Sequence, residues 1–266
     1  MKNTQIISVI NQKGGVGKTT TVINLATAIS FYNKKVLVID LDPQGNATTG
    51  FGLTNNHETT TIYDVLNGRS NFEDAIKDTK IDNLKIVSSN VDLSGLEVET
   101  ATENRRAFLL KDKIENFINS PKNDFSYIFI DCPPSLSLLT VMSLVVAKSL
   151  IVPLQAEFFA LEGLSQLMKT IDRVKIKLNP QLEIRGVLLT MFDKRNRLSA
   201  QVDTEAREFF KDKVYKTVIP RNVRLSEAPS HGVPILVYDK SCAGSKSYSD
   251  FAEEFIKQEN LMESAA

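Results

Sequence analysis

The sequence predicts an α/β fold in which helices cover both faces of a mainly parallel β-sheet. Continuous apolar runs, typical of strands buried on both faces, alternate with segments of helical patterning. A glycine-rich turn joins the first apolar run to the first helical segment. The 266 residues, 42% hydrophobic and 24% charged, suffice for one domain with a full core, and no linker or repeat divides them. We therefore expect a single domain over residues 1–266.

The first predicted strand, residues 6–10, and the first predicted helix, residues 21–29, flank the glycine-rich turn. In such a turn the glycines let backbone N–H groups face a phosphate, and the helix N-terminus adds partial positive charge. Lys18 would reach the β- and γ-phosphates, and the Thr19 hydroxyl would hold Mg²⁺. The alternative is a plain glycine turn, but the pattern favours a P-loop nucleotide site. The candidate phosphate-binding residues are Lys13, Gly14, Gly15, Val16, Gly17, Lys18, Thr19 and Thr20.

The second predicted strand, residues 35–40, ends in an acid, and another acid follows two residues later. Open α/β sheets place their sites at this carboxyl end of the strands. Residues two apart in a strand point to one face. We therefore expect Asp40 near Mg²⁺ and Asp42 over the phosphates. Asp before Pro also commonly starts a turn, and this alternative stays open for Asp42.

The third strong strand, residues 125–131, ends in Asp131. A hydrophobic strand that ends in Asp, downstream of a P-loop, predicts a Walker B acid that binds Mg²⁺ through water. No Glu follows Asp131, so the usual catalytic carboxylate is missing, which fits slow hydrolysis. The weakly patterned stretch before this strand is predicted to hold short helices at 61–66, 72–76 and 92–98, a strand at 83–87 and a helix at 105–118.

The C-terminal half carries one basic concentration. Lys+Arg and Asp+Glu both number 32, so net charge alone predicts no nucleic-acid partner. Residues 191–224 nevertheless hold nine Lys and Arg against five acids, which fits an ordinary solvated helix face as well as a nucleic-acid site. The apolar stretch 136–154 is predicted as a buried helix and a strand rather than a membrane span. The remaining predicted elements are strands at 149–154, 184–190 and 213–219, a basic loop at 191–197, a long helix that ends near residue 178 and a closing helix at 246–262.

Several strings resemble the ParA/MinD group of ATPases. The glycine-rich turn resembles their deviant Walker A motif, because it opens with a second lysine, Lys13, and has Gln12 where the usual P-loop has glycine. Residues 40–48 and 220–229 resemble segments of ParA and Soj proteins. The resemblance covers nearly the whole chain and implies a ParA/Soj-type chromosome or plasmid partitioning ATPase. With the P-loop starting by residue 13, we expect no N-terminal helix-turn-helix domain.

The resemblance also implies roles for individual residues. Lys13 would point across a dimer interface to the partner subunit's nucleotide. Asp42 would position the attacking water, so that Lys13, Lys18 and Asp42 are the expected catalytic residues. Pro220 and Asn222 would contact the adenine base.

The implied activity is weak ATP hydrolysis, with ATP and Mg²⁺ as cofactors. The ATP-bound form would be a sandwich homodimer that binds DNA without sequence preference, and a ParB-type partner would stimulate hydrolysis and release the DNA. Arg195 and Arg224 match the arginines that carry non-specific DNA binding in Soj-like proteins. Cys132 and Cys242 lie far apart in the sequence and suggest reduced thiols, so we expect a cytoplasmic protein. The resemblance further implies a bacterial, nucleoid-associated one.

The chief alternative is a MinD-like membrane ATPase, which shares the P-loop. Such proteins end in a basic amphipathic helix that lies on lipid. Residues 251–260 hold one lysine and three glutamates, which anionic lipid should repel, so we expect no membrane partner. A metabolic P-loop enzyme such as a nitrogenase iron protein would need cluster-ligating cysteines, and this chain has two cysteines in all. A sequence-specific DNA-binding regulator would need its own reading domain.

Overall fold

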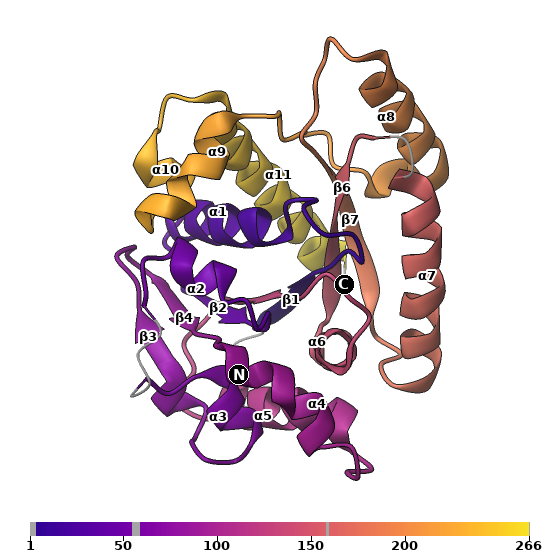
Figure 1. Ribbon diagram of the computed structural model, residues 1–266. Helices are drawn as coiled ribbons and strands as arrows, with labels where there is room; N and C mark the ends of the chain where they lie inside the picture. Colours follow the sequence, from indigo (N-terminus) through magenta and orange to yellow (C-terminus); the bar gives the residue numbers. More distant parts are fainter. Residues whose placement is uncertain (1–3, 55–58, 158–159, 266) are drawn as a thin grey trace.

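The computed structural model describes residues 4–54, 59–157 and 160–265. At its centre is a seven-stranded sheet in the order β3-β4-β2-β5-β1-β6-β7, covered by helices on both faces (Figure 1). The neighbouring strands are parallel except for the antiparallel pair β3 and β4, which confirms the predicted mainly parallel α/β fold. The strands are β1 (Gln5–Val9), β2 (Val36–Asp40), β3 (Ile76–Asp78), β4 (Leu84–Val87), β5 (Tyr127–Asp131), β6 (Ser149–Gln155) and β7 (Glu183–Thr190).

The apolar runs form strands because both of their faces are covered. In β2, Val36 and Val38 enter the hydrophobic cluster on one side of the sheet, while Leu37 and Ile39 enter the cluster on the other. Strands with two buried faces need no alternation of polar and apolar residues. This is why the continuous apolar runs predicted the strands correctly.

Two helical layers enclose the sheet. The helices α1 and α11 cover one face together with the short α2, α9 and α10, and α3 to α8 cover the other (Figure 1). The helices are α1 (Lys18–Ser30), α2 (Asn46–Gly50), α3 (Ile62–Leu66), α4 (Leu96–Glu99), α5 (Leu109–Ile118), α6 (Leu138–Val146), α7 (Ala160–Lys177), α8 (Arg197–Phe210), α9 (Val223–Glu227), α10 (Ile235–Tyr238) and α11 (Ala243–Ala265).

The predicted strand at 213–219 is wrong. Within the described residues, this segment makes one isolated bridge, Val187 with Val214, and the N–H groups of Tyr215 and Ile219 donate to carbonyl oxygens of β7, but no continuous ladder forms. Side chains form hydrogen bonds with several of the N–H and carbonyl groups that a strand would use for pairing. The Glu254 carboxylate accepts from the N–H groups of Lys216 and Thr217 at 2.7 and 2.9 Å, and the Arg207 guanidinium donates to carbonyl oxygens of the segment.

Five elements were absent from the predictions, namely α2, β3, α8, α9 and α10. Helix α8 begins after Asn196, whose side chain accepts from the N–H of Leu198 at 2.9 Å, and buries Val202, Ala206 and Phe210 at helical spacing. These are sequence signals of a helix. The short α2 and β3 give no comparable signal. Among the described residues, no helix has the length and apolar character needed to span a bilayer.

Candidate functional site

The glycine-rich turn leaves the carboxyl end of β1 and enters α1. Gly15 and Gly17 have φ angles of 75° and 88°, a left-handed conformation that favours glycine. Gly17 caps α1 without a side-chain hydrogen bond, so the first N–H groups of this helix remain open to a ligand. From β7, which is separated from β1 by β6, the Thr190 hydroxyl donates to the carbonyl of Val16 at 2.8 Å and ties the turn to that strand. The turn is therefore a fixed concave surface of backbone donors.

Two buried carboxylates lie side by side below this turn, because Asp40 of β2 is in register with Asp131 of β5. The Asp40 carboxylate is occupied: it accepts from the N–H and hydroxyl of Thr48 at 2.8 and 2.7 Å and from the N–H of Asp42 at 3.2 Å. The Thr19 hydroxyl lies close enough to lower the pKa of Asp131. Within the described residues, however, neither Asp131 oxygen has a donor at hydrogen-bonding geometry. Asp131 is thus the carboxylate that remains available for a ligand.

Burial governs the protonation of these groups. Loss of solvent raises the pKa of Asp40 to about 6, and it raises the pKa of Asp131 well above its usual range, with the neighbouring Asp40 charge adding to the effect. Burial also lowers the pKa of Lys18, while the Asp131 carboxylate opposes that shift. The Lys18 ammonium donates to the carbonyl of Lys13 at 3.0 Å. The site thus holds carboxylates whose ionised form a bound cation would stabilise.

A pocket of about 600 Å³ opens above these groups and gathers segments that are distant in sequence. Asp42 from the loop after β2 lines it, together with Pro220 and Asn222 from the opposite side. The Asn222 side-chain oxygen is buried without a hydrogen-bond partner among the described residues. The pocket also includes residues that the sequence did not predict, for which the sequence gives no signal. Among them are Thr190 and Met191 from the end of β7 and Tyr248 from α11.

Lys13 does not line this pocket. Its ammonium forms an ion pair with Glu157 in the loop after β6, and its side chain is about half exposed. Its backbone N–H donates to the Asn11 side chain at 3.0 Å, and Asn11 in turn donates to the carbonyl of Pro153 at 2.8 Å. The structure therefore directs Lys13 away from this pocket and towards Glu157.

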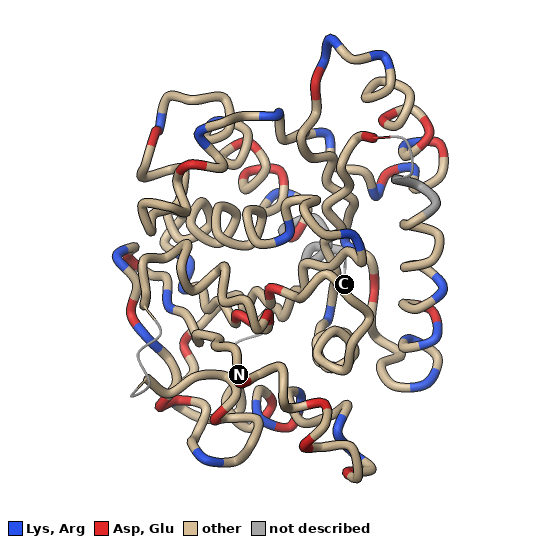
Figure 2. Tube along the Cα trace, in the orientation of Figure 1, with Lys and Arg blue, Asp and Glu red and all other residues tan. Residues whose placement is uncertain are grey.

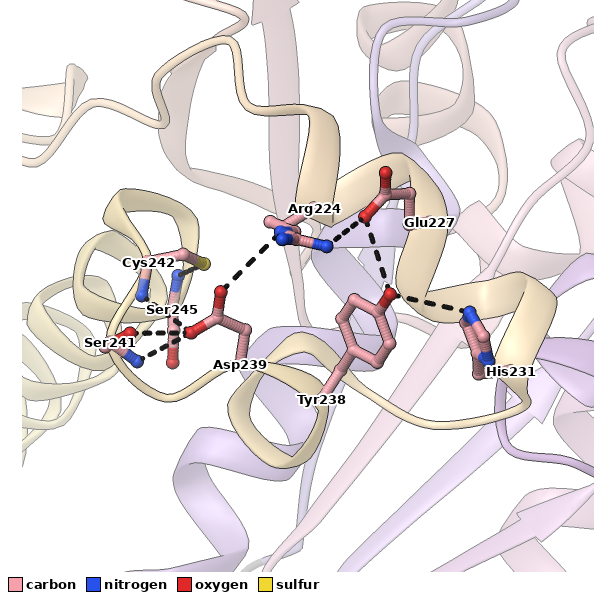
Figure 3. A network of polar contacts seen from close by, with 8 residues as sticks. All are labelled: Arg224, Glu227, His231, Tyr238, Asp239, Ser241, Cys242 and Ser245. Atoms are coloured by element: carbon pink, nitrogen blue, oxygen red, sulfur yellow. Dashed lines mark hydrogen bonds and ion pairs between the residues drawn. The ribbon is translucent and has the colours of Figure 1, made fainter.

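The two arginines predicted to bind DNA are both paired with acids. Arg195, in the loop between β7 and α8, contacts both oxygens of Asp193 at 3.1 and 3.2 Å. Arg224, in α9, lies between Glu227 at 2.9 Å and Asp239 at 3.8 Å (Figure 3). Basic positions also occur along the loop before α8 and in the segment that leads to α9 (Figure 2). Each arginine thus has a partner within its own subunit.

Comparisons with known proteins extend over the whole fold. Residues 4–184 match the family model described as AAA domain. The chromosome partitioning protein ParA of Caulobacter vibrioides is 52% identical over 256 residues, which cover 96% of this chain and 95% of that protein. The sporulation initiation inhibitor protein Soj of Bacillus subtilis is 48% identical over 94% of this chain and 97% of its own length. The crystal structure of cobyrinic acid a,c-diamide synthase from Mycobacterium smegmatis with bound ATP analogue and magnesium is 32% identical, covers 96% of this chain and 94% of that one, and superposes with a TM-score of 0.84. The chain belongs to the ParA/Soj family of chromosome-partitioning ATPases.

Proposed function

We propose that this pocket binds ATP with Mg²⁺ and that the protein uses slow ATP hydrolysis as a switch for DNA binding in chromosome or plasmid partitioning. The carrying observation is Asp131, a buried carboxylate that accepts no hydrogen bond within the described residues and lies beside Lys18 and Thr19. Thr19 and Asp131 fit a hard cation, which prefers oxygen ligands, and Asp40 adds negative charge next to them. Mg²⁺ would supply charge neutralisation at the β- and γ-phosphates.

The remaining nucleotide contacts follow the chemistry of the pocket. The backbone donors of Gly15 and Gly17 and the Lys18 ammonium suit the phosphates. At the other side of the pocket, the unpartnered Asn222 oxygen suits the amino group of adenine, and Pro220 offers an apolar surface for the base. This division supports a nucleoside triphosphate whose base is held by the segment just before α9.

We infer that ATP drives dimerisation. Lys13 is half exposed and directed away from the pocket of its own subunit. In a dimer, the nucleotide phosphates of the facing subunit could therefore replace Glu157 as the partner of Lys13. Cys132 follows Asp131 in place of a catalytic glutamate, and Asp42 is the carboxylate in the pocket that could position water. A slow reaction of this kind leaves room for a ParB-type partner to stimulate it.

DNA binding measured with ATP, with ADP and without nucleotide tests the proposed switch. Equal DNA binding in all three states would contradict it.

Gly14→Val should abolish the ATP-dependent dimer without preventing ATP binding. A Cβ at Gly14 would meet only the Pro134 Cβ, at an ordinary 3.8 Å, so the subunit itself tolerates a side chain there. In the proposed dimer the same side chain would stand between two backbones. Sedimentation with a non-hydrolysable ATP analogue measures this outcome. A stable dimer of the variant would count against the sandwich arrangement.

Asp131→Asn should stabilise the nucleotide-free protein by about 1–3 kcal/mol near neutral pH, because a buried charge without a partner is costly. Carboxyl groups with raised folded-state pKa values bind more protons in the folded than in the unfolded protein. Wild-type stability therefore falls as pH rises from about 4 through the raised pKa values of Asp40, about 6, and of Asp131. The advantage of the variant should be small at pH 4 and grow above it.

Urea unfolding at several pH values, without Mg²⁺, measures this difference. Added Mg–ATP should raise the melting temperature of the wild type but not that of Asp131→Asn. If the variant is less stable than the wild type at every pH, the Asp131 carboxylate is a satisfied structural group rather than a cation ligand.

A further inference from the structure

A second hollow, which we call the α7–α8 groove, lies between the second turn of α7 and the last turns of α8, where the two helices pack together (Figure 1). It measures about 380 Å³ and shares no residue with the nucleotide pocket. This volume is near the lower end of the range for ligand pockets, about 300–1,000 Å³, so it suits a short segment rather than a folded domain. The groove is lined by Leu164, Ser165, Glu205, Glu208, Phe209 and Phe210.

The floor of the groove is apolar. Leu164 and Phe210 are buried, whereas Phe209 keeps 66% of its surface exposed. The rings of Phe209 and Phe210 pack edge to face with their centroids 4.7 Å apart, so the exposed ring is supported by a buried neighbour. Aromatic side chains are enriched at protein interfaces and among the residues that contribute most to binding. Phe209 therefore offers an apolar contact for another protein.

Two carboxylates border this apolar surface. Glu205, Glu208 and Phe209 share one face of α8, because they are spaced by three and four residues. Among the described residues, neither glutamate takes part in an ion pair. Glu205 accepts from the Gln201 amide at 2.8 Å, which leaves its charge in place. The carbonyl end of α8, at Phe210, adds partial negative charge.

The basic residues at the end of α8 do not neutralise these acids. Arg207 donates to the Asp203 carboxylate at 2.7 Å and to the carbonyls of Val214 and Tyr215 at 3.5 and 3.2 Å, so its donors are engaged there. Lys211, which follows α8, does not line the groove. A complementary ligand must therefore bring positive charge together with a large apolar side chain.

The groove lies next to the loop that leads from the nucleotide site into α7. Glu157, which pairs with Lys13, precedes Leu164 of the groove by seven residues. The same loop is tied to the pocket, because the Ala156 N–H donates to the carbonyl of Thr190 at 3.3 Å and Thr190 lines the pocket. A protein seated on the start of α7 is thus well placed to change the rate of a reaction in that pocket.

We propose that the α7–α8 groove is the docking site for a basic, apolar segment of the partner protein that stimulates ATP hydrolysis. Lys or Arg side chains of this segment would lie against Glu205 and Glu208, and a large apolar side chain would pack on Phe209. The proposal rests on the proposed function, which includes such a partner, and deepens it by assigning the partner a position and a chemistry.

The first experiment measures hydrolysis against the concentration of the ParB-type protein of the same organism. Glu205→Lys combined with Glu208→Lys is compared with Asp82→Lys combined with Glu183→Lys, an equal change of charge at exposed positions near the amino ends of β4 and β7. The groove pair should raise the concentration for half-maximal stimulation by about tenfold or more, because like charges then face each other. The control pair should leave it unchanged, and hydrolysis without the partner protein should stay at the wild-type rate in both.

Milder variants guard against misfolding. Glu205→Gln combined with Glu208→Gln should shift the half-maximal concentration in the same direction by less, and it replaces the lysine pair if that pair does not reach the wild-type melting temperature. Phe209→Ala should raise the half-maximal concentration by about tenfold, as expected for the loss of a central aromatic contact. Ile176→Ala, at a position 79% exposed near the end of α7, is its control and should behave like the wild type.

The second experiment identifies the occupant. A benzophenone crosslinker is placed at position 209 or, as the control, at position 176, and the protein is irradiated with ATP and the ParB-type protein. Position 209 should crosslink to a segment of the ParB-type protein that holds Lys or Arg beside large apolar residues, and position 176 should not. A crosslink from position 209 to a second copy of this chain would overturn the proposal, because the groove would then join two copies.

The outcomes also separate this proposal from the proposed function. If the ParB-type protein stimulates the wild type and the groove variants at the same concentrations, it docks elsewhere and the α7–α8 groove is not its site. The proposed function stands in that case. If the ParB-type protein does not stimulate hydrolysis by the wild type at all, the proposed function itself fails, and the docking proposal fails with it.

Discussion

Lys18→Met should lower the affinity for ATP by about a hundredfold or more. Lys18 is buried at the start of α1, lines the pocket and lies beside the Asp131 carboxylate. Loss of a hydrogen bond from a charged donor costs about 1.5–3 kcal/mol. Lys18 and the phosphates of bound ATP would form a buried charge pair, and removing one member of such a pair adds to this cost. About 3 kcal/mol corresponds to roughly a hundredfold in affinity. Methionine keeps most of the side-chain volume, so the effect reports the charge rather than a cavity.

Titration with a fluorescent ATP analogue measures this loss. Lys34→Met, at an exposed position after α1, is the matched control and should bind like the wild type. DNA binding and dimerisation of the Lys18 variant should be lost together with nucleotide binding. Wild-type affinity of Lys18→Met for ATP would show that the phosphates bind elsewhere.

Asp42→Ala should suppress ATP hydrolysis by about 10²–10⁴-fold while nucleotide binding and dimerisation persist, which is the range expected for loss of a general base. Asp42 lines the pocket, and its carboxylate accepts from the N–H of Gln44 at 3.0 Å. That contact is also what a simple turn residue would make. Asp42→Asn separates the two roles, because asparagine can accept from Gln44 but cannot take a proton from water.

Both Asp42 variants should therefore be inactive, and both should remain on DNA in the presence of ATP. Phosphate release and DNA retention are the two measurements. If Asp42→Asn turns over ATP at the wild-type rate while Asp42→Ala does not, the residue holds the turn and another group acts on water.

Much of the fold was predictable, because its strands are buried on both faces and read as continuous apolar runs. The glycine-rich turn between β1 and α1 was predictable too, since its glycines and Lys18 are contiguous. The wrong strand at 213–219 shows the limit of such patterns. Whether that segment forms a strand depends on Glu254 and Arg207, two side chains from other elements. They form hydrogen bonds with its N–H and carbonyl groups, which a strand would use for pairing.

The candidate site was predictable only where its residues follow strands. Asp40 and Asp131 end neighbouring strands, and the parallel register brings them together. The two carboxylates differ in their hydrogen bonding, because the hydroxyl and N–H of Thr48 donate to Asp40 and not to Asp131. No local sequence pattern indicates this difference. The ion pair of Lys13 with Glu157 likewise comes from tertiary folding, because it joins residues far apart in the chain. Arg224 pairs locally with Glu227, three residues on in α9, and only its second partner, Asp239, comes from outside that helix.

The position of β5 has a consequence for how the chain first folds. In the sheet β5 lies between β1 and β2 and pairs with both, although it follows them by a long stretch of sequence. At synthesis rates of about 5–20 residues per second, β1 and β2 leave the ribosome roughly ten seconds before the strand that joins them. Until then their apolar edges have no partner, a situation that favours aggregation and chaperone binding. Since Asp131, the proposed cation ligand, is the last residue of β5, the proposed ATP site can form only after β5 has joined β1 and β2.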